Sequence, residues 1–255
     1  MEAILFDKDG TLSHSEPHLA SLARARLHHC LRLSGLAGGA SPRQLRLSEL
    51  LRRAYGLHSD GVDPAGALAV APRDHNLIST ATALAQSGMG WPEALAIAEE
   101  AFIRAEAPEH TPQNHPSPFP TAGLPGLLER LRRAGVRCAV ISNDEETGIR
   151  RFLERHGIAA HFDAVRSADQ RPRKPDPAAV HALCDHLGVS PGRAALIGDA
   201  NSDLRMASQA GVGLVLGYGA GWRRPPALDP SYPQLGHWNE LEVEAAGGVN
   251  AADRS

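Results

Sequence analysis

The chain of 255 residues has few cysteines, few aromatic residues and no excess of positive charge. Its three cysteines, Cys30, Cys138 and Cys184, are odd in number and widely spaced, which argues against a disulfide framework or a zinc cluster. Lysine and arginine total 26 against 29 acidic residues, a formal charge of −3, so we expect no nucleic-acid partner. No run of about 18 apolar residues occurs, and no signal-peptide pattern follows the first residues. These absences predict a cytoplasmic protein without a membrane partner.

Four short apolar segments are typical of buried strands of a parallel sheet. Each is apolar along most of its length and each ends in a glycine or polar turn; they are residues 3–6, 136–141, 194–197 and 212–216. Amphipathic helix patterns lie next to them, at residues 126–134, 147–156, 177–187 and 202–210. Strands that alternate with helices over short links predict parallel βαβ units, and hydrophobic residues at 42% are enough for a packed core.

One interval interrupts this alternation. Roughly 100 residues separate the first strand from the helix that leads to the second, whereas a crossover needs about a dozen. The interval is mostly helical in pattern, with candidate helices at residues 17–34, 45–55, 74–86 and 91–107. We therefore predict an α/β protein, a Rossmann-like parallel sheet core of residues 1–13 and 115–255 with an inserted α-helical domain of residues 14–114. A proline-rich extended linker is expected at residues 108–125, and a frayed tail at 243–255.

Polar side chains follow the predicted strands at the edge where parallel sheets bind ligands. The group includes four carboxylates, a hydroxyl and an ammonium: Asp7, Asp9, Ser142, Asn143, Lys174, Asp199 and Asp203. So many carboxylates at one edge would repel one another unless a cation lay among them, and oxygen ligands favour Mg²⁺. The sequence therefore predicts a divalent metal site.

The order of these groups resembles that of the haloacid dehalogenase-like (HAD) superfamily of phosphatases. Four motifs of that superfamily occur in order: Asp7-Lys8-Asp9-Gly10-Thr11, Ser142 after the second predicted strand, Lys174-Pro175, and Gly198-Asp199-Ala200-Asn201-Ser202-Asp203. A calcium loop beginning at Asp7 would need a Glu at its twelfth position, where His18 stands. The chain is thus identified as a member of the superfamily, similar to phosphoglycolate phosphatase-like phosphatases with a helical C1 cap.

The resemblance implies a role for each motif residue. Asp7 would be the nucleophile that forms an aspartyl phosphate, Asp9 the general acid and base, and Lys174 a fixed cation beside Asp7. The substrate phosphate would be bound by Ser142, Asn143, Lys174, Gly10 and Thr11. The metal ligands would be Asp7, Asp9 through its backbone carbonyl, Asp199 and Asp203. For Asp203, contact with a metal-bound water or with Lys174, or a helix-terminal carboxylate role, remains open.

The same resemblance makes the helical insertion a cap that closes over the site and excludes water. Seven arginines lie between His14 and Gly56, and we expect most of them to form a solvated helix face. Two related chemistries are disfavoured. True dehalogenases lack the carboxylate equivalent to Asp9, and phosphonatases need a cap lysine, whereas the chain has only Lys8 and Lys174, both in core motifs.

These observations predict a Mg²⁺-dependent phosphatase, a phosphoric monoester hydrolase acting on a small phosphorylated metabolite such as a phosphoglycolate-like acid or a sugar phosphate. One alternative is a phosphosugar mutase, which uses the same aspartate pair but keeps the phosphoryl group until the product rebinds. An alternative of another class is a non-catalytic protein that binds a phosphorylated ligand on the same fold. The sequence gives no oligomeric state.

Overall fold

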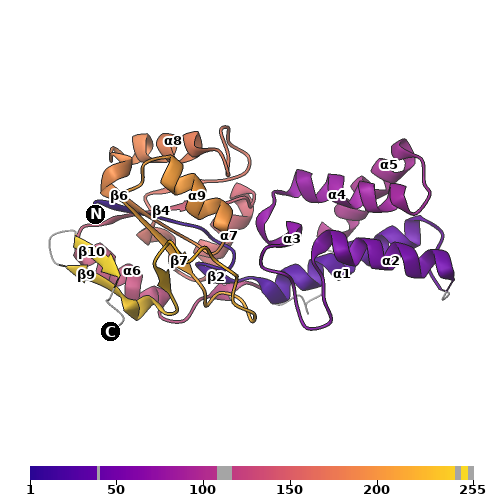
Figure 1. Cartoon of the computed structure of the whole chain (residues 1–255), viewed down its shortest axis with the longest axis horizontal. Helices are drawn as coiled ribbons and strands as arrows, with labels where there is room; N and C mark the ends of the chain where they lie inside the picture. The colour runs from indigo at the N-terminus through magenta and orange to yellow at the C-terminus, as the bar shows by residue number, and fades with distance from the viewer. Residues whose placement is uncertain (39–40, 108–116, 245–247, 252–255) are drawn as a thin grey trace. The chain divides into compact units, whose positions relative to one another are not determined.

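The structure of the chain is a computed structural model that describes residues 1–38, 41–107, 117–244 and 248–251. The chain folds into two compact units, one made of Met1–Ser15 with Pro118–Ser255 and the other of Glu16–Ser117 (Figure 1). The second predicted domain boundary, at residues 114 and 115, lies outside the described residues. Within the described ranges, no helix combines the length and the apolar character that a membrane span requires.

The first unit, which we call the core unit, contains a six-stranded sheet with the strand order β5-β4-β1-β6-β7-β8. Every pairing in this sheet is parallel, which confirms the predicted Rossmann-like α/β class. The strands are β1 (Ala3–Phe6), β4 (Arg137–Ile141), β5 (Ala164–Arg166), β6 (Ala194–Gly198), β7 (Leu214–Tyr218) and β8 (Gln234–Leu235).

Strand β1 shows why a run of four apolar residues lies at the centre of the sheet. Ile4 and Phe6 face one hydrophobic cluster, Ala3 and Leu5 face another, and all four are fully buried. The first cluster is completed by α6 (Leu124–Arg133) and α7 (Glu146–Arg155), and the second by α8 (Pro177–Leu187) and α9 (Asn201–Gln209). Both faces of the sheet are therefore covered by helices, as a parallel sheet requires.

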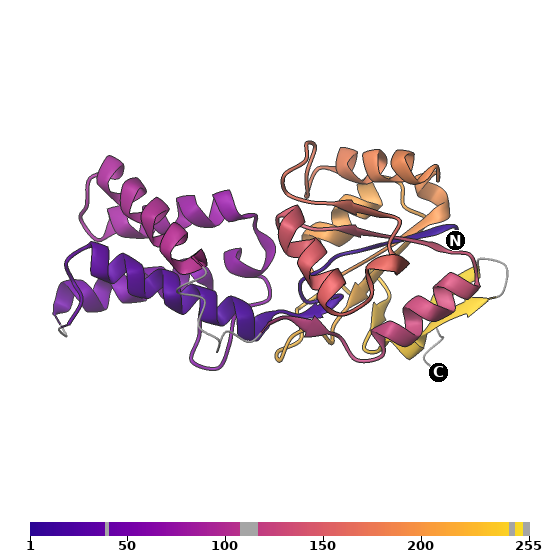
Figure 2. The ribbon, with the colours of Figure 1, turned by 180° about the vertical axis from the view of Figure 1, so that it is seen from behind.

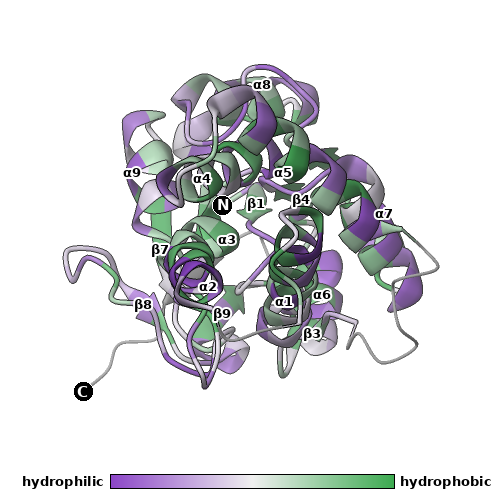
Figure 3. Cartoon of the chain, turned by 90° about the vertical axis from the view of Figure 1, so that its right-hand side faces the viewer, coloured by the Kyte–Doolittle hydropathy of each residue, from purple (hydrophilic) through white to green (hydrophobic). Residues whose placement is uncertain are grey.

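The core helices follow their sequence patterns within two residues at each end. Helix α8 begins as its sequence predicts, because the Asp176 carboxylate accepts a hydrogen bond from Ala178 N at 2.9 Å and Pro177 occupies the first turn. Figure 3 shows hydrophobic and hydrophilic colours alternating along α7 and α8, as in amphipathic helices. In α7 the buried residues are Ile149, Phe152 and Leu153, which pack on the sheet.

The second unit, which we call the helical unit, shows five helices in the part of it that the structure describes: α1 (Glu16–Leu33), α2 (Pro42–Tyr55), α3 (Ala67–Val70), α4 (Arg73–Gln86) and α5 (Trp91–Glu106). Four of these were predicted, and α3 was not. Helix α5 packs on α1 and α4, largely through alanines, while the buried Tyr55 of α2 hydrogen-bonds to Thr80 of α4 at 2.8 Å. The small alanine side chains allow the helices to pack closely around the few large residues.

Two predictions about irregular segments are wrong in part. Residues 108–125 were expected to form one extended linker, but Phe119–Pro120 forms β3, paired with β2 (Ser13–His14), and α6 begins at Leu124. The part of the linker at 108–116 lies outside the described residues. The tail was expected to fray, yet β10 (Gly248–Ala251) pairs with β9 (Leu241–Glu244).

Helix α6 contacts the first residue of the β9–β10 hairpin, which is drawn in yellow in Figures 1 and 2, because Arg130 Nη2 lies 3.5 Å from the carbonyl oxygen of Leu241. Arg130 of α6 donates a hydrogen bond to the carbonyl oxygen of Trp238 at 2.9 Å, just before β9 begins. Trp238 is itself fully buried and stacks on Tyr218 of β7. The segment that leads into the hairpin is therefore anchored to the core.

Candidate active site

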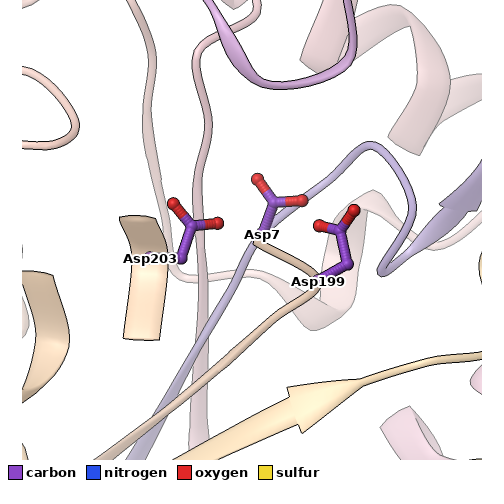
Figure 4. Close-up of side chains that lie close together, drawn as sticks. All are labelled: Asp7, Asp199 and Asp203. Atoms are coloured by element: carbon purple, nitrogen blue, oxygen red, sulfur yellow. The ribbon is translucent and has the colours of Figure 1, made fainter. Parts of the chain in front are cut away.

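Three buried carboxylates converge at the carboxyl ends of β1 and β6. Asp7 follows β1, Asp199 follows β6, and Asp203 lies in the first turn of α9 (Figure 4). One carboxylate oxygen from each lies within 4.8 Å of the other two, and the exposed fraction of each residue is 6% or less. The structure thus brings together three of the four predicted metal-ligating aspartates through their side chains.

Two features of the backbone place Asp7 and the Asp203 carboxylate at the end of β6. Asp7 N donates to the carbonyl of Ile197 at 2.9 Å, which extends the pairing of β1 with β6 to the first residue of the motif. Gly198 ends β6, and a Cβ atom there would lie 2.9 Å from Asp203 Oδ2. A side chain at position 198 would therefore displace the Asp203 carboxylate.

Lys174 lies against two of these carboxylates. Its ammonium donates to Asp7 Oδ1 at 2.7 Å and to Asp203 Oδ2 at 2.8 Å, and it is 3.4 Å from the carbonyl of Ile141 at the end of β4. Burial alone would lower the pKa of Lys174, but Asp203 and Asp7 raise it above its ordinary value. Lys174 therefore carries its positive charge beside Asp7.

Burial and the crowding of negative charge disfavour the ionised forms of Asp199 and Asp203. Burial, followed by the neighbouring charges of Asp7 and Asp203, raises the pKa of Asp199 well above its usual range. Burial also raises the pKa of Asp203 to about 6, although Lys174 opposes that shift. Three carboxylates and one ammonium leave a formal charge of −2 in a buried space. Hard oxygen ligands with this charge fit a divalent cation such as Mg²⁺.

The turn after β1 places two further motif residues against Asp199. Gly10 has a φ of 81°, and a Cβ atom there would lie 2.0 Å from Trp222 Nε1 and 2.3 Å from Asp199 Oδ2, so a side chain is excluded. Thr11 is fully buried and its hydroxyl donates to Asp199 Oδ1 at 3.2 Å. The Thr11 side chain is thus directed to a carboxylate of the cluster.

Trp222 was not singled out by the sequence analysis. Its indole Nε1 donates to Asp199 Oδ2 at 2.5 Å, and the residue is 5% exposed. Asp199 is therefore held by Thr11 on one oxygen and by Trp222 on the other. Trp222 follows Gly221 and belongs to none of the four motifs, so only the folded chain reveals this contact.

Asp9 lies outside the three-carboxylate cluster as far as its side chain is concerned. Its carboxylate Oδ1 accepts from Lys8 Nζ at 2.6 Å and from the hydroxyl of Ser15. Lys8 also contacts Asp144 Oδ2 at 2.9 Å. Burial alone would lower the pKa of Lys8, but Asp144 and Asp9 raise it above its ordinary value. Neither Lys8 nor Asp144 was predicted as a site residue.

The predicted phosphate-binding residues after β4 lie at the same edge of the sheet. Ser142 is 3% exposed, its backbone N donates to the carbonyl of Arg166, and its hydroxyl accepts from Asp144 N at 3.1 Å. Asn143 is partly buried. The Ser142 hydroxyl therefore stabilises the loop that carries Asp144.

Comparison with known proteins gives the family. The family model of haloacid dehalogenase-like hydrolases matches residues 1–211. The phosphoglycolate phosphatase of Pseudomonas savastanoi pv. phaseolicola is 31% identical over 235 residues, which cover 88% of this chain and 72% of that protein. That of Neisseria meningitidis serogroup A is 27% identical, covering 86% and 82% of the two chains.

Solved structures share the fold. The crystal structure of a predicted phosphoglycolate phosphatase from Haemophilus somnus has a TM-score of 0.64 at 22% identity, covering 92% of this chain and 93% of that one. A HAD-superfamily hydrolase of subfamily IA from Geobacter sulfurreducens has a TM-score of 0.57 at 20% identity, covering 94% of each chain.

The chain belongs to the haloacid dehalogenase-like hydrolases, which confirms the resemblance stated from its motifs. The prediction of an enzyme of the phosphatase class is confirmed by the same relatives.

Proposed function

We propose that the protein is a Mg²⁺-dependent phosphatase that hydrolyses a small phosphorylated metabolite through an aspartyl phosphate on Asp7. The observation that carries this proposal is the position of Asp7. Its carboxylate lies beside a buried ammonium at 2.7 Å and within a cluster of three carboxylates. A carboxylate is nucleophilic at neutral pH without a separate base, so the surroundings need only orient it and neutralise the charge of the phosphoryl group.

In the first step, the Asp7 carboxylate attacks phosphorus and the bond from phosphorus to the leaving-group oxygen breaks. Asp9 gives its proton to that oxygen, which leaves as an alcohol. In the second step, Asp9 takes a proton from water, the water oxygen attacks phosphorus, and phosphate departs with the Asp7 carboxylate restored. Lys174 stays charged throughout and stabilises the negative charge of the transferring group from the Asp7 side.

Asp7, Asp199 and Asp203 would hold the metal, with the backbone carbonyl of Asp9 as a further ligand. When bound, Mg²⁺ would neutralise charge on the phosphoryl oxygens and on the carboxylates. Asp203 also contacts Lys174 at 2.8 Å, so it would fix the lysine and serve the metal at the same time. Thr11 and Trp222 would orient Asp199.

Phosphoglycolate is the first substrate to test, because several relatives at 30% identity or more bear the name phosphoglycolate phosphatase. Sugar phosphates form the second class. The assignment of the helical unit as a cap, the roles of Ser142, Asn143, Gly10 and Thr11 in phosphate binding, and the cytoplasmic location stay predictions.

The test is a screen of phosphorylated acids and sugars with Mg²⁺, in which phosphate release and kcat/KM are measured for each compound. We expect turnover by the wild type that EDTA abolishes, and no detectable turnover by Asp7→Asn. Arg150→Met, which removes a surface ion pair of α7, is the matched control and keeps wild-type rates. Turnover by Asp7→Asn at wild-type rates would contradict the proposal.

The same screen separates the alternatives. A phosphosugar mutase would convert one sugar phosphate into its isomer faster than it releases phosphate. A non-catalytic protein would bind a phosphorylated compound without turning it over. Either result would replace the phosphatase proposal.

A further inference from the structure

Lys8 occupies the variable position between the two aspartates of the first motif. Its side chain is 5% exposed, although a lysine at a turn is ordinarily solvated. The ammonium bridges two carboxylates, Asp9 at 2.6 Å and Asp144 at 2.9 Å. Asp9 belongs to the turn after β1 and Asp144 to the loop after β4. Lys8 therefore ties together the two loops between which the phosphoester would be held.

Two donors lie against the Oδ1 oxygen of Asp9. Lys8 Nζ and the Ser15 hydroxyl both donate to Oδ1. Ser13 and Ser15 lie with their hydroxyl oxygens 2.6 Å apart. The Ser13 hydroxyl also lies 3.1 Å from the carbonyl oxygen of Lys8 and 3.5 Å from Asp9 Oδ1. The two serines and Lys8 thus surround Oδ1 and restrict the rotation of the Asp9 carboxyl group.

An ammonium and a hydroxyl that both donate to Oδ1 restrict the rotation of the Asp9 carboxyl group. These contacts therefore set the direction in which the carboxyl group faces the substrate. The Lys8 ammonium makes the strongest of these contacts, because it is charged and buried. Asp144 holds the ammonium from the opposite side, and Asp144 is itself fixed by its backbone bond to Ser142.

We propose that Lys8 is a positioning residue that aims Asp9 at the leaving-group oxygen, and that the Lys8–Asp144 pair thereby extends the enzyme's substrates to phosphoesters of ordinary alcohols. The proposal rests on the proposed phosphatase function. An alcohol is a poor leaving group and needs the proton that Asp9 supplies, whereas nitrophenolate departs without one. If Asp9 is no longer correctly oriented, kcat/KM therefore falls more for an alkyl phosphate than for p-nitrophenyl phosphate.

The experiment compares Lys8→Met with the wild type on two substrates: the alkyl phosphate that the wild type hydrolyses fastest, and p-nitrophenyl phosphate. The measured quantity is kcat/KM, which reports the steps up to departure of the leaving group. We expect a loss of about 100-fold for the alkyl phosphate and of less than about tenfold for the nitrophenyl ester. Lys8→Arg, which keeps a buried cation, recovers part of the alkyl activity.

Asp144→Asn provides a second variant that leaves Lys8 in place. It removes one anchor of the ammonium, so the same selective loss is expected at a smaller size. Arg150→Met is the matched control in the core unit and changes both substrates equally, by less than about twofold. Thermal unfolding of each variant identifies any that fails to fold, and in that case Asp144→Asn and Lys8→Arg carry the test.

The decisive measurement is a double-mutant cycle in the Asp9→Asn background. If Lys8 acts through Asp9, adding Lys8→Met to Asp9→Asn produces no further selective loss on the alkyl phosphate. Equal losses on both substrates, or a full additional loss in the Asp9→Asn background, would overturn the proposal for Lys8. Absence of turnover by the wild type on every phosphoester would instead refute the proposed function, so the two failures are distinguishable.

Discussion

The chain has two lysines among 26 basic residues, and both are buried in the core unit. Each bridges two carboxylates: Lys174 contacts Asp7 and Asp203, and Lys8 contacts Asp9 and Asp144. An ammonium is a compact point charge that can lie between two carboxylates, whereas the planar guanidinium of arginine matches one carboxylate with two parallel bonds. The use of lysine at these two positions thus suits bridging.

The two bridges differ in their surroundings. The partners of Lys174 are 9% and 5% exposed at their side chains, whereas those of Lys8 are 19% and 34% exposed. A buried charge that loses its partner is costly, and a partly solvated one is less so. We infer that Lys174 balances the negative charge of the attacking Asp7 carboxylate. Lys8 instead acts on Asp9, the residue that gives a proton to the leaving group and takes one from water.

The largest effect is expected from Lys174→Met. The variant leaves Asp7 and Asp203 without their cation, so kcat/KM falls about 100- to 1000-fold on both alkyl and nitrophenyl substrates, because the loss is not specific to the leaving group. The free energy of unfolding, measured in urea, falls by about 3–5 kcal/mol. A leaving-group preference equal to that of Lys8→Met would erase the distinction between the two lysines.

The second-largest effect concerns metal binding by the carboxylates near Lys174. Trp222→Phe keeps an aromatic ring but removes the hydrogen bond to Asp199. An orienting partner of a metal ligand is worth about 10- to 100-fold in affinity, so we expect the Mg²⁺ dissociation constant to rise by that factor. Isothermal titration calorimetry measures it without turnover. Trp91→Phe, at a 46% exposed position in α5, is the control and should bind Mg²⁺ like the wild type. Unchanged affinity in Trp222→Phe would mean that Trp222 only packs.

Much of this site could be predicted from the sequence, because its motifs follow strands that an apolar run identifies. Asp7, Lys174, Asp199 and Asp203 meet because parallel strands end at one edge of the sheet. Lys8 and Asp144 could not be predicted in the same way. Lys8 fills the unspecified position of the first motif and Asp144 belongs to none of the four motifs, and their contact joins residues far apart in the chain.

The fold shows the same limit. The apolar runs and amphipathic patterns located the central strands and the helices, whereas β5 was missed because it is a short edge strand whose residues are only partly buried. We expected most of the seven arginines between His14 and Gly56 to be solvated, but Arg26 is 4% exposed and its Cζ lies 3.6 Å from the Phe102 ring centroid. Packing partners in α5, which sequence spacing does not specify, decide its burial.

Arg26 provides a buried cation in the helical unit, whereas both lysines belong to the core unit. Its Nη2 contacts Glu106 at 2.7 Å, while Arg73 binds the same carboxylate. Burial lowers the pKa of Arg26 despite that carboxylate. We expect Arg26→Met to lower the free energy of unfolding by about 2 kcal/mol, since Glu106 keeps Arg73 as a partner. Its kcat should stay within about twofold of the wild type. A loss of kcat as large as that of Lys174→Met would show that burying a cation anywhere affects catalysis.

The smallest effect on stability is expected for a solvent-exposed ion pair. Glu129 of α6 pairs with Arg132 and Arg133 on the surface. A hydrogen bond from Arg132 is the main cause that lowers the pKa of Glu129 from 4.5 to about 2. The ionised carboxylate therefore contributes its stability above pH 4.5, and that contribution is lost as the pH falls towards 2. We expect the Tm of Arg132→Gln to lie slightly below that of the wild type at pH 7 and low salt, with the difference shrinking over that acidic range and on addition of salt. A Tm difference that persists in high salt would mean that Arg132 stabilises α6 by packing, and the contrast between solvated and buried ion pairs would then not rest on charge alone.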